Sequence, residues 1–225
     1  MKYRLGELFC GPGGIALGAM SAKIKDNKHS IVHQWANDYD KDTCATYKHN
    51  ICPNSKKSVV HGDVRKLDFS KLPEIDALAF GFPCNDFSIV GEQKGMDGVY
   101  GPLYSYGVKA LKIFQPRWFL AENVGGLRNA NDGNAFSKIL DELRKAGYKI
   151  VPHLYKFENY GIPQARHRII IVGIRNDLDV TYKVPSPAPY SHIDNTAKKA
   201  IEVPPILKDF LNNELTKQSP TVVKR

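Results

Sequence analysis

The sequence has no long apolar run and no leader-like start. Nothing in it approaches the roughly 18 consecutive apolar residues of a membrane-spanning helix. The N-terminus leads directly into a charged, strand-like segment without the pattern of a secretory signal peptide. These absences predict a cytoplasmic protein with no membrane partner. A hydrophobic share of 42% over 225 residues is enough for one large domain with a buried core.

Cysteine is scarce, and its four positions lack metal-binding spacing. Cys10, Cys44, Cys52 and Cys84 form no CxxC pair, and none stands at a zinc-finger interval from a histidine. We therefore predict reduced thiols and no metal. The first three are expected to be small buried side chains, whereas Cys84 has a different context, described below.

The dinucleotide fingerprint GxGxxG is also absent at its usual spacing, as are internal repeats and low-complexity tracts. A nicotinamide-dependent oxidoreductase is thus the least favoured of the functions considered. What the sequence has in excess is positive charge, with 32 Lys and Arg against 23 Asp and Glu, a net charge of +9. This excess favours a polyanionic partner such as nucleic acid.

Apolar runs alternate with helix-like segments, which is typical of a parallel sheet wrapped by helices. The pattern predicts an α/β sandwich of three layers, and Gly147 is a natural stop for the last helix. Strands are expected at residues 5–9, 31–37, 58–61, 77–82, 118–123, 149–157 and 168–174, and helices at residues 14–22, 40–50, 103–114 and 134–146. The glycine-rich segment 85–102 has the length of a functional lid or a disordered loop. After residue 184, prolines mark an exit segment with one short helix near residues 206–212.

A glycine-rich turn, LFCGPGG at residues 8–14, ends the first expected strand and opens a helix. Glycine lets the backbone approach a ligand closely, and a helix N-terminus offers N–H groups, so a nucleotide-like cofactor is indicated. A purely structural turn is the alternative. Asp38 and Asp63 follow the next two strands, where a carboxylate could hold a ribose hydroxyl or an adenine amino group. Alternatively, Asp38 belongs to a helix N-cap region and Asp63 to a turn.

Cys84 follows Pro83 at the end of a buried strand and opens the glycine-rich loop. Its sulfur could reach a cleft, where loop N–H groups would lower its pKa, so we interpret it as a nucleophile. Glu122 leaves the apolar strand at residues 118–121, and partial desolvation should raise its pKa and let it donate a proton. A glutamate that caps the following turn is the alternative.

Arg166 and Arg168 stand two residues apart at the start of an expected strand, so they should point to the same side while His167 points away. Two guanidinium groups on one face could grip a phosphate or hold a carboxylate. Two solvated arginines are the alternative for this pattern taken alone.

Together these motifs resemble the ordered signatures of the cytosine-C5 DNA methyltransferase family. The motifs are LFCGPGG at 8–14, GFPC at 81–84 with Phe87 and Ser88, ENV at 122–124, YGIP at 160–163 and QxRxR at 164–168. The resemblance covers roughly residues 4–176. It implies the S-adenosylmethionine-dependent, Rossmann-like methyltransferase fold, with a mostly parallel sheet of seven strands whose last strand is antiparallel.

The resemblance also implies a covalent mechanism. The thiolate of Cys84 would attack C6 of a flipped-out cytosine, and Glu122 would hydrogen-bond and protonate N3. C5 would then take the methyl group of S-adenosylmethionine, leaving S-adenosylhomocysteine. The implied catalytic residues are Cys84, Glu122, Arg166 and Arg168. The implied cofactor-binding residues are Phe9, Pro12, Gly14, Asp38, Tyr39, Asp63, Val64, Gly81, Pro83 and Leu103, and the substrate-binding residues are Asn85, Ser88, Asn123, Val124 and Gln164.

The chain departs from the family pattern in several places. Glu7 replaces the aspartate common before the Leu-Phe pair, Asp38 stands in place of glutamate, and Asn85 in place of glutamine. Residues 1–184 would form the catalytic domain, and residues 185–225 would lead towards a target-recognition domain that this sequence lacks. The family's final motif pair, which completes the cofactor site, finds no match. We therefore expect a fragment, or the larger subunit of a split enzyme with a separate C-terminal partner, that methylates weakly or not at all alone.

The implied partner is double-stranded DNA, in a bacterial or phage restriction-modification setting. Two rivals stay open besides the oxidoreductase. A related branch of the family methylates tRNA, although the run at residues 85–88 is closer to the DNA enzymes. A methyltransferase-like module without activity is the other, and the presence of Cys84, Glu122 and both arginines argues against it.

Overall fold

The computed structural model describes residues 1–22, 29–83, 103–162 and 164–187. By its internal contacts the chain divides into a first unit, Met1–Tyr155 with Arg168–Val184, and a second unit, Lys156–His167 with Pro185–Arg225. The loop predicted at residues 85–102 and the helix predicted near 206–212 lie outside the described residues. The division at residue 184 into a catalytic domain and an exit segment stays a prediction.

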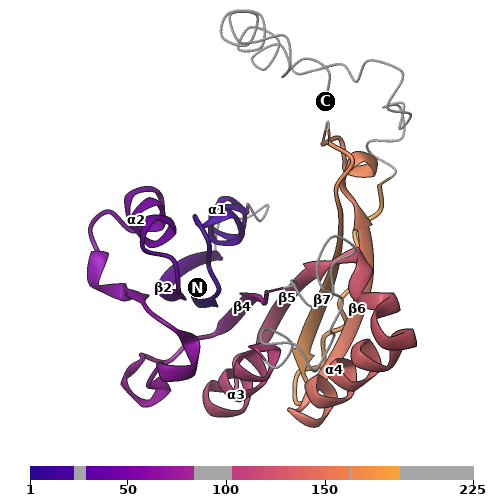
Figure 1. Cartoon of the computed structure of the whole chain (residues 1–225). Helices are drawn as coiled ribbons and strands as arrows, with labels where there is room; N and C mark the ends of the chain where they lie inside the picture. Colours follow the sequence, from indigo (N-terminus) through magenta and orange to yellow (C-terminus); the bar gives the residue numbers. More distant parts are fainter. Residues whose placement is uncertain (23–28, 84–102, 163, 188–225) are drawn as a thin grey trace, which may run out of the picture. The chain divides into compact units, whose positions relative to one another are not determined.

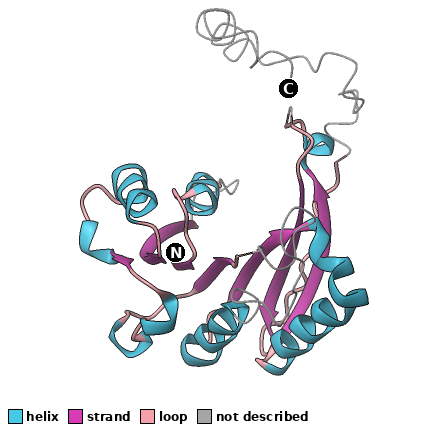
Figure 2. Cartoon of the chain, in the orientation of Figure 1, coloured by secondary structure: helices cyan, strands magenta, loops and turns pink. Residues whose placement is uncertain are grey.

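The strands form one sheet, drawn in magenta in Figure 2. It has seven strands in the order β3-β2-β1-β4-β5-β7-β6. The pairs β1–β2, β1–β4, β2–β3 and β4–β5 are parallel, and β5–β7 is antiparallel. The predicted α/β fold with a mostly parallel sheet and an antiparallel last strand is therefore confirmed. The strands are β1 (Lys2–Leu8), β2 (Ser30–Asp38), β3 (Val59–His61), β4 (Ala77–Gly81), β5 (Trp118–Val124), β6 (Tyr148–Lys156) and β7 (His167–Arg175).

Helices cover both faces of the sheet, so the predicted three layers are present (Figure 1). They are α1 (Gly14–Ser21), α2 (Lys41–Asn50), α3 (Tyr104–Phe114) and α4 (Asn134–Lys145). Side chains of a strand alternate between its two faces, and β4 shows how this sorts the core. Ala77 and Ala79 pack with residues of α1 and α2, whereas Leu78 and Phe80 pack with residues of α3 and α4. Small residues thus let α1 and α2 approach one face closely, and large ones fill the other.

The second unit is described only in part. A short 3-10 helix, η7 (Phe157–Tyr160), carries Glu158, whose Oε1 lies 2.7 Å from His167 Nε2. The hydroxyl of Tyr160 donates to the carbonyl of Pro185 at 3.0 Å. Within the described ranges of both units, no helix has the length and hydropathy needed to cross a membrane.

Gly173 allows β7 to pack against Phe119, its partner on β5. A Cβ at residue 173 would lie 2.0 Å from Cε1 of Phe119, a ring with no exposed surface. Gly173→Ala should therefore lower the free energy of unfolding by about 1–3 kcal/mol through overpacking. Gly18→Ala is the matched control, because its added Cβ would meet nothing within 4 Å. In helix α1 this second change should raise stability by about 1 kcal/mol. Denaturant unfolding measures the free energy of unfolding of both variants. Equal free energies of unfolding in the two variants would contradict the packing described.

Candidate functional site

A glycine-rich turn joins β1 to α1 and is tied to the end of β2. Phe9, Gly11 and Gly13 all have left-handed backbone angles, with φ of 54°, 54° and 100°. The N–H of Gly11 donates to Oδ2 of Asp38 at 2.8 Å. Added Cβ atoms at Gly11 and Gly14 would meet nothing within 4 Å, so the turn leaves open space beside its backbone. Such a surface fits a ligand that approaches main-chain groups closely.

The carboxylate of Asp38 binds the backbone of this turn and that of the connection from β2 to α2. Its Oδ1 accepts from the N–H of Asp40 at 2.9 Å, while Oδ2 accepts from Gly11. The N-cap of α2 is Asp40, whose side chain accepts from Thr43 N–H at 2.7 Å. The N-cap itself is Asp40, and Asp38 lies two residues before it, in the N-cap region that the alternative named. A ribose contact of Asp38 stays a prediction.

Three more of the predicted cofactor residues follow β2 and β3. Tyr39 is 76% exposed, so its ring is accessible to a stacking partner. Asp63 caps a short 3-10 helix and lies 2.7 Å from the Arg65 guanidinium, whose hydrogen bond is the largest of the causes that lower the pKa of Asp63. Val64 is buried. The contacts of Asp63 within the chain are therefore those of a turn residue, which was the alternative considered for it.

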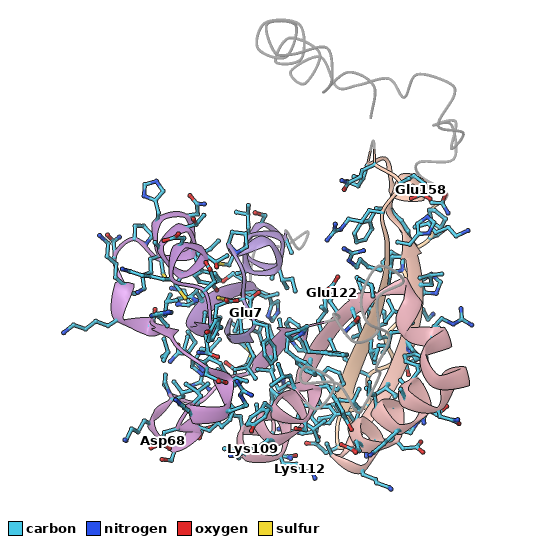
Figure 3. All side chains as sticks on the ribbon, in the orientation of Figure 1. Glu7, Asp68, Lys109, Lys112, Glu122 and Glu158 are labelled. Atoms are coloured by element: carbon cyan, nitrogen blue, oxygen red, sulfur yellow. The ribbon has the colours of Figure 1, made fainter. Side chains whose placement is uncertain are left out.

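Glu122, labelled in Figure 3, lies near the end of β5. It is paired with Gly81 of β4 and contacts Arg168 of β7. Its Oε1 is 2.8 Å from Nε of Arg168, with 27% of the Glu122 side chain and 19% of the Arg168 side chain exposed. A Cβ on Gly81 would lie 3.2 Å from the other oxygen, Oε2. Of the two uses considered for Arg168, holding a carboxylate is the one that these contacts show. Glycine at residue 81 leaves room for that carboxylate.

Asn123 ties the end of β5 to the chain that leads to Cys84. Its Nδ2 donates to the carbonyl of Phe82 at 3.1 Å, and its Oδ1 accepts from the N–H of Val124 at 2.8 Å. The side chain is 2% exposed. Asn123 thus supports the backbone two residues before Cys84. Of the other predicted residues in this region, Pro83 is the last one described, and Cys84, Asn85 and Ser88 lie outside the described residues.

The remaining predicted residues are spread over both units. Gly14 is the first residue of α1, Pro12 belongs to the glycine turn, and Leu103 is buried just before α3. Gln164 and Arg166 are exposed residues of the second unit, and the backbone carbonyl of Arg166 accepts from Phe157 N–H. That Arg166 and Arg168 act as a pair stays a prediction.

Cys10, Cys44 and Cys52 are free and buried, as the sequence predicts. Burial is the largest cause that raises the pKa of each of these thiols. A raised pKa disfavours the thiolate, which is the nucleophilic form. Within the described ranges, no group of three or more His, Cys, Asp and Glu side chains is arranged to hold a metal ion.

Sequence reasoning missed the environment of Glu7, which is 1% exposed in β1. Burial raises its pKa to about 8; the hydrogen bond with Tyr47 lowers it and the charge of Asp38 raises it further. Oε2 of Glu7 lies 3.0 Å from the Tyr47 hydroxyl, and its buried Oε1 has no hydrogen-bond partner. The available signal was the alternation of β1, which places residue 7 on the same face as the buried Leu5.

Comparison with known proteins identifies proteins that are similar to this chain in sequence. The family model of the C-5 cytosine-specific DNA methylase matches residues 3–224. Type II methyltransferase M.BbvI of Brevibacillus brevis is 55% identical over 235 residues, covering 100% of this chain and 62% of that protein. Type II methyltransferase M.NgoFVII of Neisseria gonorrhoeae is 33% identical and covers 97% of this chain and 57% of that protein. The chain thus spans about three fifths of the length of these two relatives.

Solved structures share the fold. The crystal structure of the S. pombe Dnmt2 methyltransferase superimposes with a TM-score of 0.60 at 19% identity, over 89% of this chain and 57% of that one. At this identity the likeness shows the fold alone. The family model, in contrast, matches almost the whole sequence. The chain therefore belongs to the C-5 cytosine-specific DNA methylase family.

Proposed function

We propose that this chain carries the cofactor site and the reactive residues of a DNA (cytosine-5-)-methyltransferase of a Type II restriction-modification system. Family membership and the two Type II relatives support the proposal. The observation that carries it is that the end of β5 contacts both reactive parts of the proposed site, the proton donor and the segment that leads to the nucleophile. Glu122 presents its carboxyl group there, and Asn123 binds the backbone that leads to Cys84.

The reaction begins with the thiolate of Cys84, which forms a bond to C6 of the cytosine. The displaced electron pair of the C5–C6 double bond moves towards N3, where Glu122 donates a hydrogen bond and a proton. Arg168 holds Oε1 of Glu122, so the carboxyl group is oriented before the base arrives. S-adenosylmethionine supplies the methyl group for C5. Loss of the C5 proton to a base then expels the Cys84 thiolate, and return of the N3 proton to Glu122 restores the neutral ring and the acid form of the enzyme.

The glycine turn and its neighbours are proposed to bind this cofactor. The turn has the open backbone surface that a close ligand needs, and the helix N-terminus of α1 follows it. Phe9 and the exposed Tyr39 would stack against adenine, while Asp38 and Asp63 would accept from ribose and adenine groups. The other residues proposed for this site are Pro12, Gly14, Val64, Gly81, Pro83 and Leu103.

The substrate class is tested with a chimera in which this chain replaces the matched part of M.BbvI, assayed by transfer of a tritiated methyl group to DNA and, separately, to tRNA. We expect transfer to DNA only. Cys84→Ser should abolish transfer while leaving the dissociation constant for S-adenosylhomocysteine unchanged, because the hydroxyl is a far weaker nucleophile. Methylation of tRNA, or full activity of the Cys84→Ser chimera, would overturn the assignment.

Glu122→Gln in the same chimera should lower kcat by about 10²–10⁴-fold, because the amide cannot deliver a proton to N3. Binding of S-adenosylhomocysteine should be unaffected. Asp177→Asn is the matched control, since Asp177 pairs at 2.7 Å with Arg175, which lies at the opposite end of β7 from Arg168, the partner of Glu122. This control should keep the parent kcat. Equal losses in the two variants would mean that the Glu122 effect comes from a disturbed β7 and not from proton transfer.

A further inference from the structure

A chain of hydrogen-bonded side chains runs from the interior of the first unit towards its surface. It comprises Glu7 of β1, Tyr47 of α2, His33 of β2 and Ser58, and is called the polar chain below. Oε2 of Glu7 lies 3.0 Å from the Tyr47 hydroxyl, which lies 3.1 Å from Nδ1 of His33. Nε2 of His33 lies 2.6 Å from Oγ of Ser58. Figure 3 marks its inner end at Glu7.

The outer end of the polar chain fixes the direction of its hydrogen bonds. Oγ of Ser58 lies 2.5 Å from the carbonyl oxygen of Ser55. A carbonyl only accepts, so the single hydroxyl hydrogen of Ser58 is used there. Oγ of Ser58 must then accept from His33, which requires a hydrogen on Nε2.

Only two arrangements of hydrogens keep all four bonds. If Glu7 is ionised, Tyr47 donates to it, and His33 must donate to Tyr47 from Nδ1 as well as to Ser58 from Nε2, so His33 is an imidazolium. If Glu7 is a carboxylic acid, it donates to Tyr47, which donates to Nδ1 of a neutral His33. Both arrangements hold the same number of protons, and they interconvert when one proton shifts along the Glu7–Tyr47 bond and another along the Tyr47–His33 bond.

The burial of the Glu7 carboxyl group decides between these two arrangements of hydrogens. Oε1 of Glu7 is buried without a partner, which costs far less for the carbonyl oxygen of an acid than for half of a carboxylate. We propose that Glu7 is a protonated carboxylic acid that donates to Tyr47 and, through that ring, positions the glycine turn of the cofactor site. Burial acts on both partners in this direction, because it raises the pKa of Glu7 and lowers the pKa of His33.

The ring of Tyr47 is where the polar chain meets the glycine turn. A Cβ on Gly13 would lie 3.1 Å from Cδ2 of Tyr47 and 2.7 Å from Cγ1 of Ile51, so the turn rests directly on these side chains. A shift of Tyr47 would therefore shift the turn. This part of the inference rests on the proposed cofactor site, whereas the protonation of Glu7 does not.

Glu7 is the group of this region that titrates first above neutral pH. The other titratable or charged groups that act on the polar chain or on its neighbouring thiols are Asp38, Asp40, Cys10, Cys44, Cys52 and Lys48. Burial raises the pKa of Glu7 to about 8 and raises the pKa values of Tyr47 and the three thiols above their ordinary values. Removal of the Glu7 proton leaves three hydrogens, those of Tyr47, His33 and Ser58, for the four bonds, so one bond of the polar chain is lost.

The sign of the pH dependence follows from that loss. In the unfolded chain Glu7 ionises near its ordinary pKa, whereas in the folded chain it keeps its proton up to about pH 8. The contribution of Glu7 to the stability of the fold is therefore complete at low pH. It disappears as the pH rises through the pKa that Glu7 has in the folded chain. Cofactor affinity should follow the same direction, because the turn is held best by the acid form.

Carbon-13 NMR of the 225-residue chain with labelled glutamate tests the protonation directly. The Cδ resonance of Glu7, assigned through its backbone, should have the shift of a carboxylic acid at pH 7 and move to that of a carboxylate near pH 8. Nitrogen-15 NMR should show His33 neutral, with its hydrogen on Nε2. A carboxylate shift for Glu7 at pH 7, or an imidazolium at His33, would overturn the proposal even if no variant folds.

Titration of the M.BbvI chimera, in which the cofactor site is complete, with S-adenosylhomocysteine between pH 7 and 10 tests the link to the turn. The apparent dissociation constant should rise by up to about tenfold per pH unit above the pKa of Glu7. Glu7→Gln, which keeps a hydrogen donor to Tyr47, should remove this rise. The difference between the two profiles cancels the titration of the ligand's own amino group.

Glu142→Gln is the matched control, because Glu142 is likewise hydrogen-bonded to a tyrosine hydroxyl, that of Tyr104 at 2.9 Å, but is partly exposed and outside the polar chain. It should keep the parent profile. An unchanged slope in Glu7→Gln would overturn the positioning role. Absence of binding in every variant at every pH would count against the proposed cofactor site, and the NMR result would then decide the protonation alone.

Discussion

Backbone groups that leave a parallel sheet at its carboxyl edge lose their ladder partners, and this chain satisfies them with polar side chains from neighbouring strand ends. Asp38 binds the N–H of Gly11, and Asn123 binds the carbonyl of Phe82. Asn37 reaches from β2 to the carbonyl groups of Val60 and Gly62, both at 2.9 Å. Irregular turns at this edge are thereby held in fixed positions, and ligands of open α/β sheets bind at such edges.

Two glutamates on strands of the same sheet have different surroundings. Glu122 is partly exposed and paired with a guanidinium, which orients its carboxyl group. Glu7 is buried with a tyrosine hydroxyl as its partner and no cation beside it in the described contacts. Placing two carboxyl groups in contrasting environments is how proteins assign them different protonation roles. Here the proposed roles are proton donation to the base and support of the cofactor turn.

The sequence predicted the strands and helices well because period-two and helical spacing depend on local residues alone. The antiparallel last strand came from the family resemblance and was confirmed. The partner of Glu122 could not be chosen between Arg166 and Arg168 beforehand, because it depends on the register of β5 and β7, which sets Val124 opposite Arg168. Glu7 was noted only as a departure from the family pattern. Its partner Tyr47 lies forty residues away on another element, and no spacing rule connects them.

The central claim is that Cys84 forms the covalent bond to cytosine beside a strand end that carries Glu122. Trapping of the chimera on DNA that contains 5-fluorocytosine, followed by mass spectrometry of the digested adduct, tests it most directly, because fluorine at C5 prevents release of the enzyme. The account predicts that the modified nucleotide is found on the peptide that contains Cys84. An adduct on Cys10, Cys44 or Cys52, or methylation without any adduct, would contradict it.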